Sequence, residues 1–299
     1  RAKMSIAVIG AGKWGSALFH AFSENNECLI SSRTPREMSN FVSLDEALEC
    51  EYLVCTIPTQ ATNLWLKQNY KNKGQKILVA SKGIDTANLK FLNEIYEDFV
   101  NSENLAFLSG PTFAKEIMQK LPCALVVNSK NQNLALKFAS FFPSYMKAYT
   151  SDDVIGAEVC GAYKNVIAIA GGICDGLGLG NNARASLISR GLVEMARFGK
   201  FFGAKDETFM GLSGAGDLFL TASSILSRNY RVGLGIARHE RLEKILNELG
   251  EVAEGVDTAR AISKIAKEKS IYVPIASEVE NMLNGKDVFE SVKSLLGRR

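Results

Sequence analysis

The chain has 299 residues, of which 46% are hydrophobic and 22% are charged, and its formal net charge is +3. These values are typical of a globular protein, and the length suits one or two domains. The charge includes no block of basic residues, which argues against a nucleic-acid-binding protein and is compatible with an anionic small substrate.

The 6 cysteines lie in apolar runs and form no C-x-x-C pair. This usage indicates reduced core cysteines in a cytoplasmic protein, and no metal site is expected. No apolar run is expected to reach membrane-spanning length, because the longest one, near Val166–Cys174, is interrupted by Gly171 and Gly172.

The first predicted strand, Ile6–Ile9, runs directly into a glycine-rich turn and a helix. In this context a G-x-G-x-x-G motif is typical of dinucleotide binding. Gly10 would permit the tight turn, Gly12 would let a pyrophosphate approach the backbone, and Gly15 would let the helix pack on the strand. The first N–H groups of the helix would hold the phosphates. The alternative is a plain glycine turn between a core strand and a core helix.

The second predicted strand covers Glu27–Ser31. In dinucleotide-binding folds, the residues at the end of this strand determine the choice between NAD and NADP. An acidic residue there would bind the ribose 2′-hydroxyl of NAD. This chain instead has Ser31, Ser32 and Arg33. Arg33 suits the 2′-phosphate of NADPH, which is therefore the favoured cofactor, and the alternative is an exposed loop arginine.

Five further strands are predicted in the first half, with helices between them: residues 52–57, 76–81, 105–108, 124–127 and 146–149. This alternation predicts a doubly wound parallel sheet of the Rossmann type over residues 4–151. Ligands bind such sheets beyond the carboxyl ends of the strands, so one edge should collect the residues that follow them: Gly10, Pro58, Lys82 and Gly110. Lys82 is the charged group of this edge, or else a solvated loop lysine. Thr112 is expected to cap a helix over Phe113–Gln119.

After Ser151 the strand pattern stops, and residues 152–299 are predicted to form an all-α domain. Its first helix, which ends near Cys174, has an apolar stripe and a second face of small residues that also carries Lys164 and Asn165. Each glycine costs a helix about 1 kcal/mol relative to alanine, which suggests that another group approaches this face. A lysine held there can serve as acid and base. The alternative is a surface lysine.

A second glycine-rich turn, Gly211–Gly216, leads into a helix that begins at Asp217. Asp217 and Thr221 are four residues apart and share one helix face. Further along, Arg228 and Asn229 offer a planar guanidinium and an amide, a combination suited to a phosphate. The alternative for the turn is a simple connection between helices. After Asn229, one helix is predicted over Arg231–Leu249.

The acid–base chemistry points to lysine. The 2 histidines, His20 and His239, lie at positions poorly suited to donating a proton to a substrate. Lys82 and Lys164 come from different predicted domains. If they meet across a cleft, they form a doubly cationic site that would polarise a carbonyl and bind a dianion.

Taken together and in order, these motifs resemble those of bacterial NAD(P)-dependent glycerol-3-phosphate dehydrogenases over nearly the whole chain. The stretches that carry the resemblance are Gly10–Gly15, Ser81–Gly83, Ser109–Ala114, Gly161–Asn165, Gly214–Asp217 and Ser227–Asn229. Members of that family are oxidoreductases that interconvert dihydroxyacetone phosphate and sn-glycerol 3-phosphate, mainly to supply phospholipid synthesis.

The resemblance implies that Lys164 transfers the proton, assisted by Lys82 and Asp217. The substrate site is expected to comprise Lys82, Gly110, Thr112, Lys164, Asn165, Asp217, Thr221, Ser227, Arg228 and Asn229. The site for NADP or NAD is expected to comprise Gly10, Gly12, Lys13, Trp14, Gly15, Arg33, Lys82, Ala114, Arg228, Val252 and Glu254.

Two other functions stay open. A related β-hydroxyacid or ketopantoate-type reductase would also join a nucleotide-binding sheet to helices, but it lacks this order of Lys-Asn, Gly-Asp and Arg-Asn. A non-enzymatic NADPH sensor would need the glycine motif without Lys164, Asp217 and Arg228. The expected partner is a phosphorylated small molecule, with no nucleic acid and no membrane insertion, and the sequence leaves open whether the chain is a homodimer.

Overall fold

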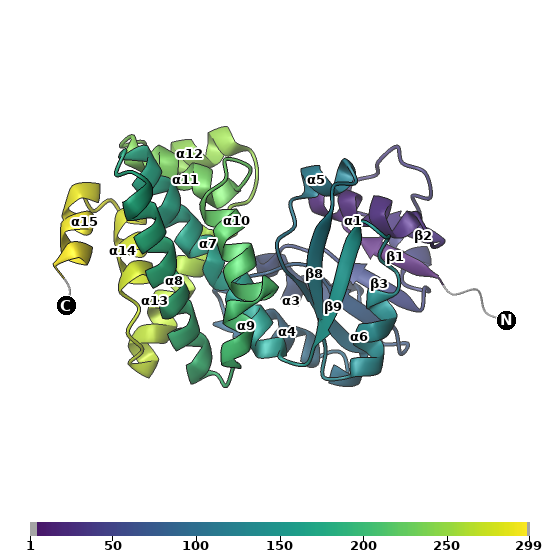
Figure 1. Ribbon diagram of the computed structural model, residues 1–299. Coiled ribbons are helices and arrows are strands. Elements are labelled where there is room, and N and C mark those ends of the chain that lie inside the picture. The colour runs from purple at the N-terminus through teal and green to yellow at the C-terminus, as the bar shows by residue number, and fades with distance from the viewer. Residues whose placement is uncertain (1–4, 298–299) are drawn as a thin grey trace. The chain divides into compact units, whose positions relative to one another are not determined.

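The computed structural model describes residues 5–297, which divide into two units (Figure 1). Unit 1 contains the described residues up to Lys82 and the segment Leu92–Ala157, and unit 2 contains Gly83–Phe91 and the described residues from Glu158 on. The boundary predicted at residue 151 differs from this division in two ways. The chain changes unit inside the helix that follows, and Gly83–Phe91 belongs to unit 2. Residue 4 of the predicted first domain and residues 298–299 of the second lie outside the described residues.

Unit 1 is built on a 7-stranded sheet with the order β2-β1-β3-β4-β7-β8-β9. All seven strands fall where the sequence predicts them: β1 (Ile6–Ile9), β2 (Cys28–Ser31), β3 (Tyr52–Cys55), β4 (Lys76–Val79), β7 (Leu105–Ser109), β8 (Cys123–Asn128) and β9 (Met146–Ser151). Parallel pairing dominates, as predicted.

One pair departs from the predicted parallel pattern, because β8 runs antiparallel to β7. A parallel return needs a crossover of a dozen or more residues, usually with a helix long enough to span the sheet. The helix in this link, α5 (Ala114–Met118), has 5 residues. A helix of that length spans only about 7.5 Å, so β8 starts at the edge where β7 ends.

Both faces of β1 are buried. Ile6 and Val8 belong to one hydrophobic cluster, whereas Ala7 and Ile9 belong to another. Alternate residues of a strand point to opposite faces, so β1 is covered on both sides, as a doubly wound sheet requires. The helices of unit 1 are α1 (Lys13–Ser23), α2 (Leu44–Ala47), α3 (Thr59–Asn69), α4 (Leu92–Glu97), α5 and α6 (Gln132–Ala139).

Unit 2 contains a short antiparallel hairpin that the sequence analysis did not predict, formed by β5 (Ile84–Asp85) and β6 (Lys90–Phe91). The buried Asp85 carboxylate accepts hydrogen bonds from the Ala87 N–H and the Asn88 side chain, which fixes the turn. The Phe91 ring packs edge-on against Phe202, with 5.6 Å between centroids. Strands of 2 residues are too short to show a period in the sequence.

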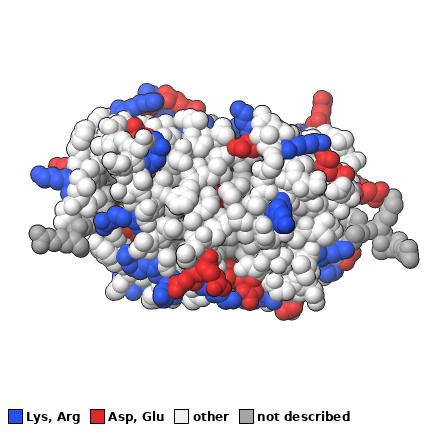
Figure 2. All heavy atoms as spheres, viewed as in Figure 1, with Lys and Arg blue, Asp and Glu red and all other residues white. Residues whose placement is uncertain are grey.

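The rest of unit 2 is helical: α7 (Val154–Gly176), α8 (Asn181–Phe201), α9 (Asp206–Met210), a π-helical turn (Leu212–Gly216), α10 (Asp217–Ala222), α11 (Arg228–Ala237), α12 (Leu242–Leu249), α13 (Glu254–Lys269), α14 (Pro274–Leu283) and α15 (Val288–Leu296). A single helix predicted over 231–249 is wrong. The chain breaks it between α11 and α12, where His239 takes the left-handed conformation with φ 59°. On the face in Figure 2, side chains of both charges are interspersed.

Helix α7 is the central helix of unit 2. From Glu158 to Cys174 each of its residues is buried except Lys164. By length and composition α7 could cross a membrane, so the prediction that no run reaches that length is wrong for this helix, but 89% of its apolar window is buried inside the protein. Such burial is what a core helix of a globular unit shows.

The close approach predicted at the glycine face of α7 is confirmed. A Cβ on Gly171 would lie 2.3 Å from the Ala222 carbonyl oxygen, and one on Gly172 would lie 2.0 Å from the Tyr230 carbonyl oxygen. The groups that approach this face are therefore the backbones of α10 and α11.

Candidate active site

The glycine-rich turn between β1 and α1 is shaped by its own backbone. Gly10 has a φ of +112°, and a Cβ on Gly15 would lie 2.0 Å from the Gly10 carbonyl oxygen. Gly12 is different, because it is exposed and, apart from its chain neighbours, no described atom lies within 4 Å of where its Cβ would be. The first and third glycines thus allow the fold, and the second leaves open space at the start of α1.

The start of α1 fits the phosphates of a dinucleotide. Gly12 is the N-cap, and the first turn contains no acidic residue and carries the exposed Lys13. The first N–H groups of a helix and its positive dipole end attract anions, and here no side-chain carboxylate of that turn competes for them. These residues would hold the pyrophosphate of NAD or NADP.

Arg33 lies two residues beyond the end of β2 and is exposed. The last residue of β2, Ser31, accepts a hydrogen bond of 2.8 Å from the Gly10 N–H, so β2 ends beside the glycine turn. The chain from Ser31 to Arg36 contains no carboxylate. This end of β2 therefore suits an extra phosphate better than a ribose hydroxyl.

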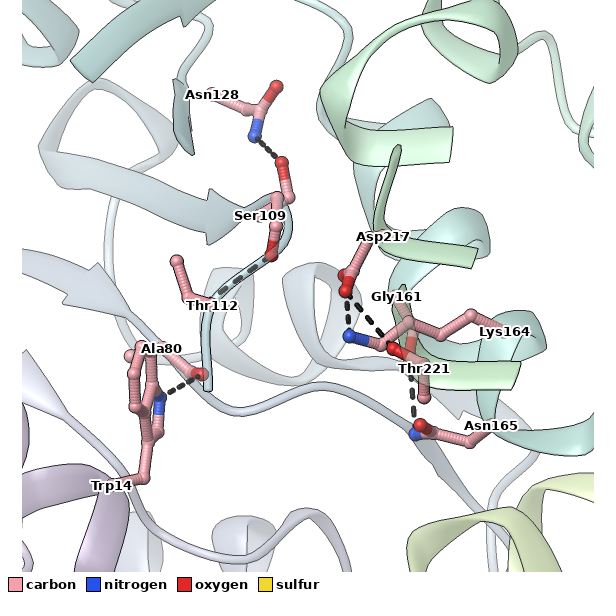
Figure 3. Close-up of polar contacts among 11 residues, drawn as sticks. Trp14, Ala80, Ser109, Thr112, Asn128, Gly161, Lys164, Asn165, Asp217 and Thr221 are labelled. Carbon is pink, nitrogen blue, oxygen red and sulfur yellow. Dashed lines mark hydrogen bonds and ion pairs between the residues drawn. The ribbon is translucent and has the colours of Figure 1, made fainter. Parts of the chain in front are cut away.

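The residues around Lys82 are held by hydrogen bonds within unit 1. Trp14 donates from its indole nitrogen to the Ala80 carbonyl at 3.0 Å (Figure 3). Ser81 donates to the Ile57 carbonyl at 2.6 Å, and the Lys82 carbonyl accepts from Thr59 at 3.2 Å. Trp14 thus fixes the end of β4, from which the half-buried Lys82 follows.

The turn after β7 departs from one prediction. Phe113, not Thr112, is the N-cap of α5, and Thr112 donates instead to the Gly110 carbonyl at 3.4 Å. Gly110 has a φ of +115°, and a Cβ on it would lie 2.9 Å from Leu125 Cα, so this position requires glycine. Ala114 is the first residue of α5.

Asn128 was not anticipated from the sequence. It donates to Ser109 Oγ at 2.8 Å and to the Phe107 carbonyl at 3.0 Å, and so ties β8 to β7 just before Gly110 (Figure 3). A buried asparagine inside a strand was the available signal, because such a side chain must find hydrogen-bond partners.

In unit 2, Lys164 and Asp217 form an ion pair with 2.5 Å between Nζ and Oδ2 (Figure 3). The Asp217 side chain is 2% exposed and that of Lys164 is 12% exposed. Thr221 donates to the other oxygen of Asp217 at 3.2 Å. A buried carboxylate must be paired and hydrogen-bonded, so Lys164 and Thr221 hold Asp217, and Asp217 in turn holds the lysine ammonium.

The π-helical turn Leu212–Gly216 places Asp217 at the start of α10. A Cβ on Gly214 would lie 2.2 Å from the Phe209 carbonyl oxygen, so the turn needs glycine to fold back over α9. Single π-helical turns are frequent at functional sites. The glycine-rich stretch before Asp217 is therefore a positioning element.

The residues expected to bind phosphate lie at the start of α11. Ser227 is its N-cap and accepts a hydrogen bond from the Tyr230 N–H at 3.2 Å. Arg228 is exposed, whereas Asn229 is buried and accepts from the Gly255 N–H at 2.8 Å. Asn165 donates to the Gly161 carbonyl at 3.4 Å.

Two residues expected at the cofactor lie at the entrance to α13. Val252 is 52% exposed, and Glu254 is the first residue of the helix. The next residue of the helix, Gly255, is the one bonded to Asn229. The structure thus connects this loop to α11 inside unit 2. The meeting of Lys82 with Lys164 stays a prediction.

A buried carboxylate supports α7 next to Lys164. Tyr163 donates to Glu194 at 2.6 Å, and Glu194 also accepts from the N–H groups of Ile275 and Ala276 at 2.7 and 3.0 Å. Burial raises the pKa of Glu194, and the hydrogen bonds from Tyr163 and from the start of α14 oppose that rise. Glu194 thereby joins α7, α8 and α14. Glu194 could have been identified in the sequence as one acidic residue on the apolar face of α8.

These features define a class. A glycine turn suited to a dinucleotide in unit 1, and a lysine held by a buried carboxylate in unit 2, characterise a nicotinamide-dependent dehydrogenase with separate cofactor and catalytic parts. Among residues 5–297 no group of three His, Cys, Asp or Glu side chains could hold a metal ion.

Comparison with known proteins specifies the class. The family model of the NAD-dependent glycerol-3-phosphate dehydrogenase N-terminus matches residues 22–135, and that of the C-terminus matches residues 153–293. The glycerol-3-phosphate dehydrogenase [NAD(P)+] of Campylobacter jejuni is 64% identical over 293 residues, covering 98% of this chain and 99% of that protein. The protein of that name from Sulfurimonas denitrificans is 63% identical over 291 residues, covering 97% and 98%.

A solved structure agrees. The crystal structure of glycerol-3-phosphate dehydrogenase from Coxiella burnetii is 30% identical, covers 99% of each chain and superposes with a TM-score of 0.90. This chain therefore belongs to the NAD-dependent glycerol-3-phosphate dehydrogenase family.

Proposed function

We propose that this chain interconverts dihydroxyacetone phosphate and sn-glycerol 3-phosphate with NADPH or NADH, and that it supplies phospholipid synthesis in the cytoplasm. The observation that carries the proposal is the ion pair of Lys164 and Asp217, in a chain of this family. Between Glu158 and Cys174, Lys164 is the one residue of α7 that is not buried, so a substrate can reach it.

Lys164 acts as the general acid and base. The bound nicotinamide cofactor supplies hydride in reduction and accepts it in oxidation. As negative charge grows on the substrate oxygen, Lys164 donates a proton to that oxygen, and it takes the proton back in the reverse direction. Asp217 orients the ammonium group, and Thr221 orients Asp217.

Cationic and amide groups bind the phosphate. Arg228 offers its guanidinium at the exposed start of α11, and the neighbouring Asn229 offers its side-chain amide. Lys82 binds the substrate and stabilises the developing oxyanion. Gly110 and Thr112 complete the substrate site from the turn after β7.

The test is NADPH oxidation with a panel of phosphorylated and unphosphorylated ketones. We expect turnover with dihydroxyacetone phosphate far above that with unphosphorylated ketones. A preference for a branched or carboxylated ketone such as ketopantoate would favour the related reductase. NADPH binding without turnover of any ketone would favour the sensor.

We also propose that the chain forms a homodimer through unit 2. Phe219, Ile225 and Leu226 lie close together in sequence at α10 and the turn after it, and they are 49%, 59% and 39% exposed. Clustered exposed apolar side chains are typical of association surfaces. Light scattering over a range of concentrations tests this, and the mass of a single chain throughout would contradict it.

A further inference from the structure

Gly255, the second residue of α13, is bonded to a side chain from another helix. Its N–H donates to Asn229 Oδ1 on α11 at 2.8 Å, and both residues are buried. The first four N–H groups of a helix have no acceptor inside that helix. The N-cap of α13 is Ala253, whose methyl side chain cannot accept a hydrogen bond. Asn229 therefore provides a cap that the local sequence of α13 does not.

The position accepts no side chain. A Cβ on Gly255 would lie 2.7 Å from the Asn165 carbonyl oxygen and 2.7 Å from Asn229 Oδ1. Gly255 lies within the helix, so its backbone conformation does not call for glycine. Glycine is required there because α7 and the Asn229 amide approach too closely for a side chain.

This bond decides which way the Asn229 amide lies. An asparagine side chain has an acceptor oxygen on one side and an NH₂ donor on the other, and only the oxygen can accept from a backbone N–H. With Oδ1 directed at Gly255, the group that Asn229 can offer a ligand is its NH₂. A phosphate dianion has acceptor oxygens only, so it needs donors.

We propose that Gly255 is a positioning residue, which fixes the Asn229 amide so that its NH₂ group is presented to the phosphate of the substrate. The inference rests on the proposed function, in which Asn229 binds that phosphate. The competing explanation is that the bond between Gly255 and Asn229 is only a helix cap.

Asn229→Asp separates the two explanations. The carboxylate keeps an acceptor for the Gly255 N–H, and a negative charge is favourable at the start of α13, so the melting temperature should be maintained. The second carboxylate oxygen replaces the NH₂ and repels the phosphate. We expect KM for dihydroxyacetone phosphate to rise about tenfold or more, and kcat/KM for unphosphorylated dihydroxyacetone to change by less than about twofold. A cap alone predicts an unchanged KM for both ketones.

Gly255→Ala tests the positioning role itself. The added methyl group should displace the Asn229 amide, and KM for dihydroxyacetone phosphate should again rise more than that for dihydroxyacetone. The matched control is Gly191→Ala on α8, where a Cβ would lie 2.8 Å from Ile167 Cγ2, a similar degree of crowding away from Asn229. It should leave both KM values unchanged.

The outcomes are distinct. A folded Gly255→Ala protein with the wild-type KM for dihydroxyacetone phosphate would overturn the inference, as would an Asn229→Asp protein with that KM. If Gly255→Ala does not fold, Asn229→Asp decides alone. Failure of the wild-type chain to reduce dihydroxyacetone phosphate would instead refute the proposed function.

Discussion

In unit 1, the glycine turn between β1 and α1 leaves open space at Gly12, whereas in unit 2 the space beside Gly171 and Gly172 is filled by the backbones of α10 and α11. The same residue type therefore serves two purposes. In the turn it admits a ligand, and in α7 it admits neighbouring helices. A glycine-rich pattern indicates close approach, but the identity of the approaching group depends on what the rest of the chain places there.

The two units also differ in how they would meet phosphate. In unit 1 the backbone at the start of α1 is available, with no acidic residue in the first turn. In unit 2 the side chains of Arg228 and Asn229 are available at the start of α11. Unit 2 also holds Lys164 against a buried carboxylate. We therefore expect unit 1 to govern cofactor binding, and unit 2 to govern proton transfer and substrate binding.

The largest effect should follow from Lys164→Ala. Loss of general acid–base catalysis should lower kcat by about 10²–10⁴-fold, while NADPH affinity changes little because the glycine turn is in unit 1. Steady-state kinetics and NADPH titration measure the two quantities. Lys164→Met is the control, since it keeps much of the stem and removes the proton. A folded Lys164→Ala enzyme with near-normal kcat would make Lys82 the next candidate.

Arg228→Ala should weaken substrate binding next most strongly. The guanidinium is exposed, so the expected loss is that of a hydrogen bond to a charged group, about 1.5–3 kcal/mol, and not that of a buried pair. KM for dihydroxyacetone phosphate measures it. Because the same arginine is expected to touch the cofactor, KM for NADPH should be recorded alongside. An unchanged KM for the ketone would count against the assignment.

Gly172→Ala should act on stability. Its Cβ would lie 2.0 Å from the Tyr230 carbonyl oxygen, and overpacking of this kind costs about 1–3 kcal/mol. The free energy of unfolding should fall by that amount, with KM for NADPH unaffected. Equal stability of variant and wild type would show that α11 moves aside easily, and would contradict the difference between the filled space at Gly172 and the open space at Gly12.

Gly12→Ala should weaken cofactor binding and leave stability unchanged. The backbone of Gly12 has φ −73°, which alanine can adopt, and no described atom lies where the methyl would be. Stability should therefore change by less than about 0.5 kcal/mol, as at a surface position. KM for NADPH should rise about tenfold, because the methyl would occupy the approach of the pyrophosphate. Normal NADPH binding by this variant would contradict the assignment of the glycine turn to pyrophosphate binding.

The smallest effect concerns cofactor choice. We expect the wild type to use NADPH at least as well as NADH, and Arg33→Asp to shift the ratio of the two kcat/KM values toward NADH. Since Arg33 is exposed, the change should stay below about 1.4 kcal/mol, or tenfold. A strong preference for NADH in the wild type would refute the role of Arg33.

Local patterns account for much of the agreement between prediction and structure. An apolar run such as Ile6–Ile9 forms a strand because both of its faces can be buried, and the strands of the main sheet lie where the sequence predicts them. The start of α11 was predicted less well. Ser227 caps this helix, whereas the predicted helix begins at Arg231. The hairpin Gly83–Phe91 was missed altogether, since its stability comes from α13 and Phe202, far along the chain.

The sequence by itself determined the glycine turn and its helix, the order of strands followed by helices, and the residues expected at the site. These follow from backbone freedom, hydrophobic period and chemical type, which are local properties. Only the tertiary structure decided that β8 runs antiparallel to β7, that α10 and α11 occupy the glycine face of α7, and that Gly255 orients Asn229. Each of these depends on which distant segment arrives at a given position, and the burial and hydrogen bonding of the whole chain settle that at once.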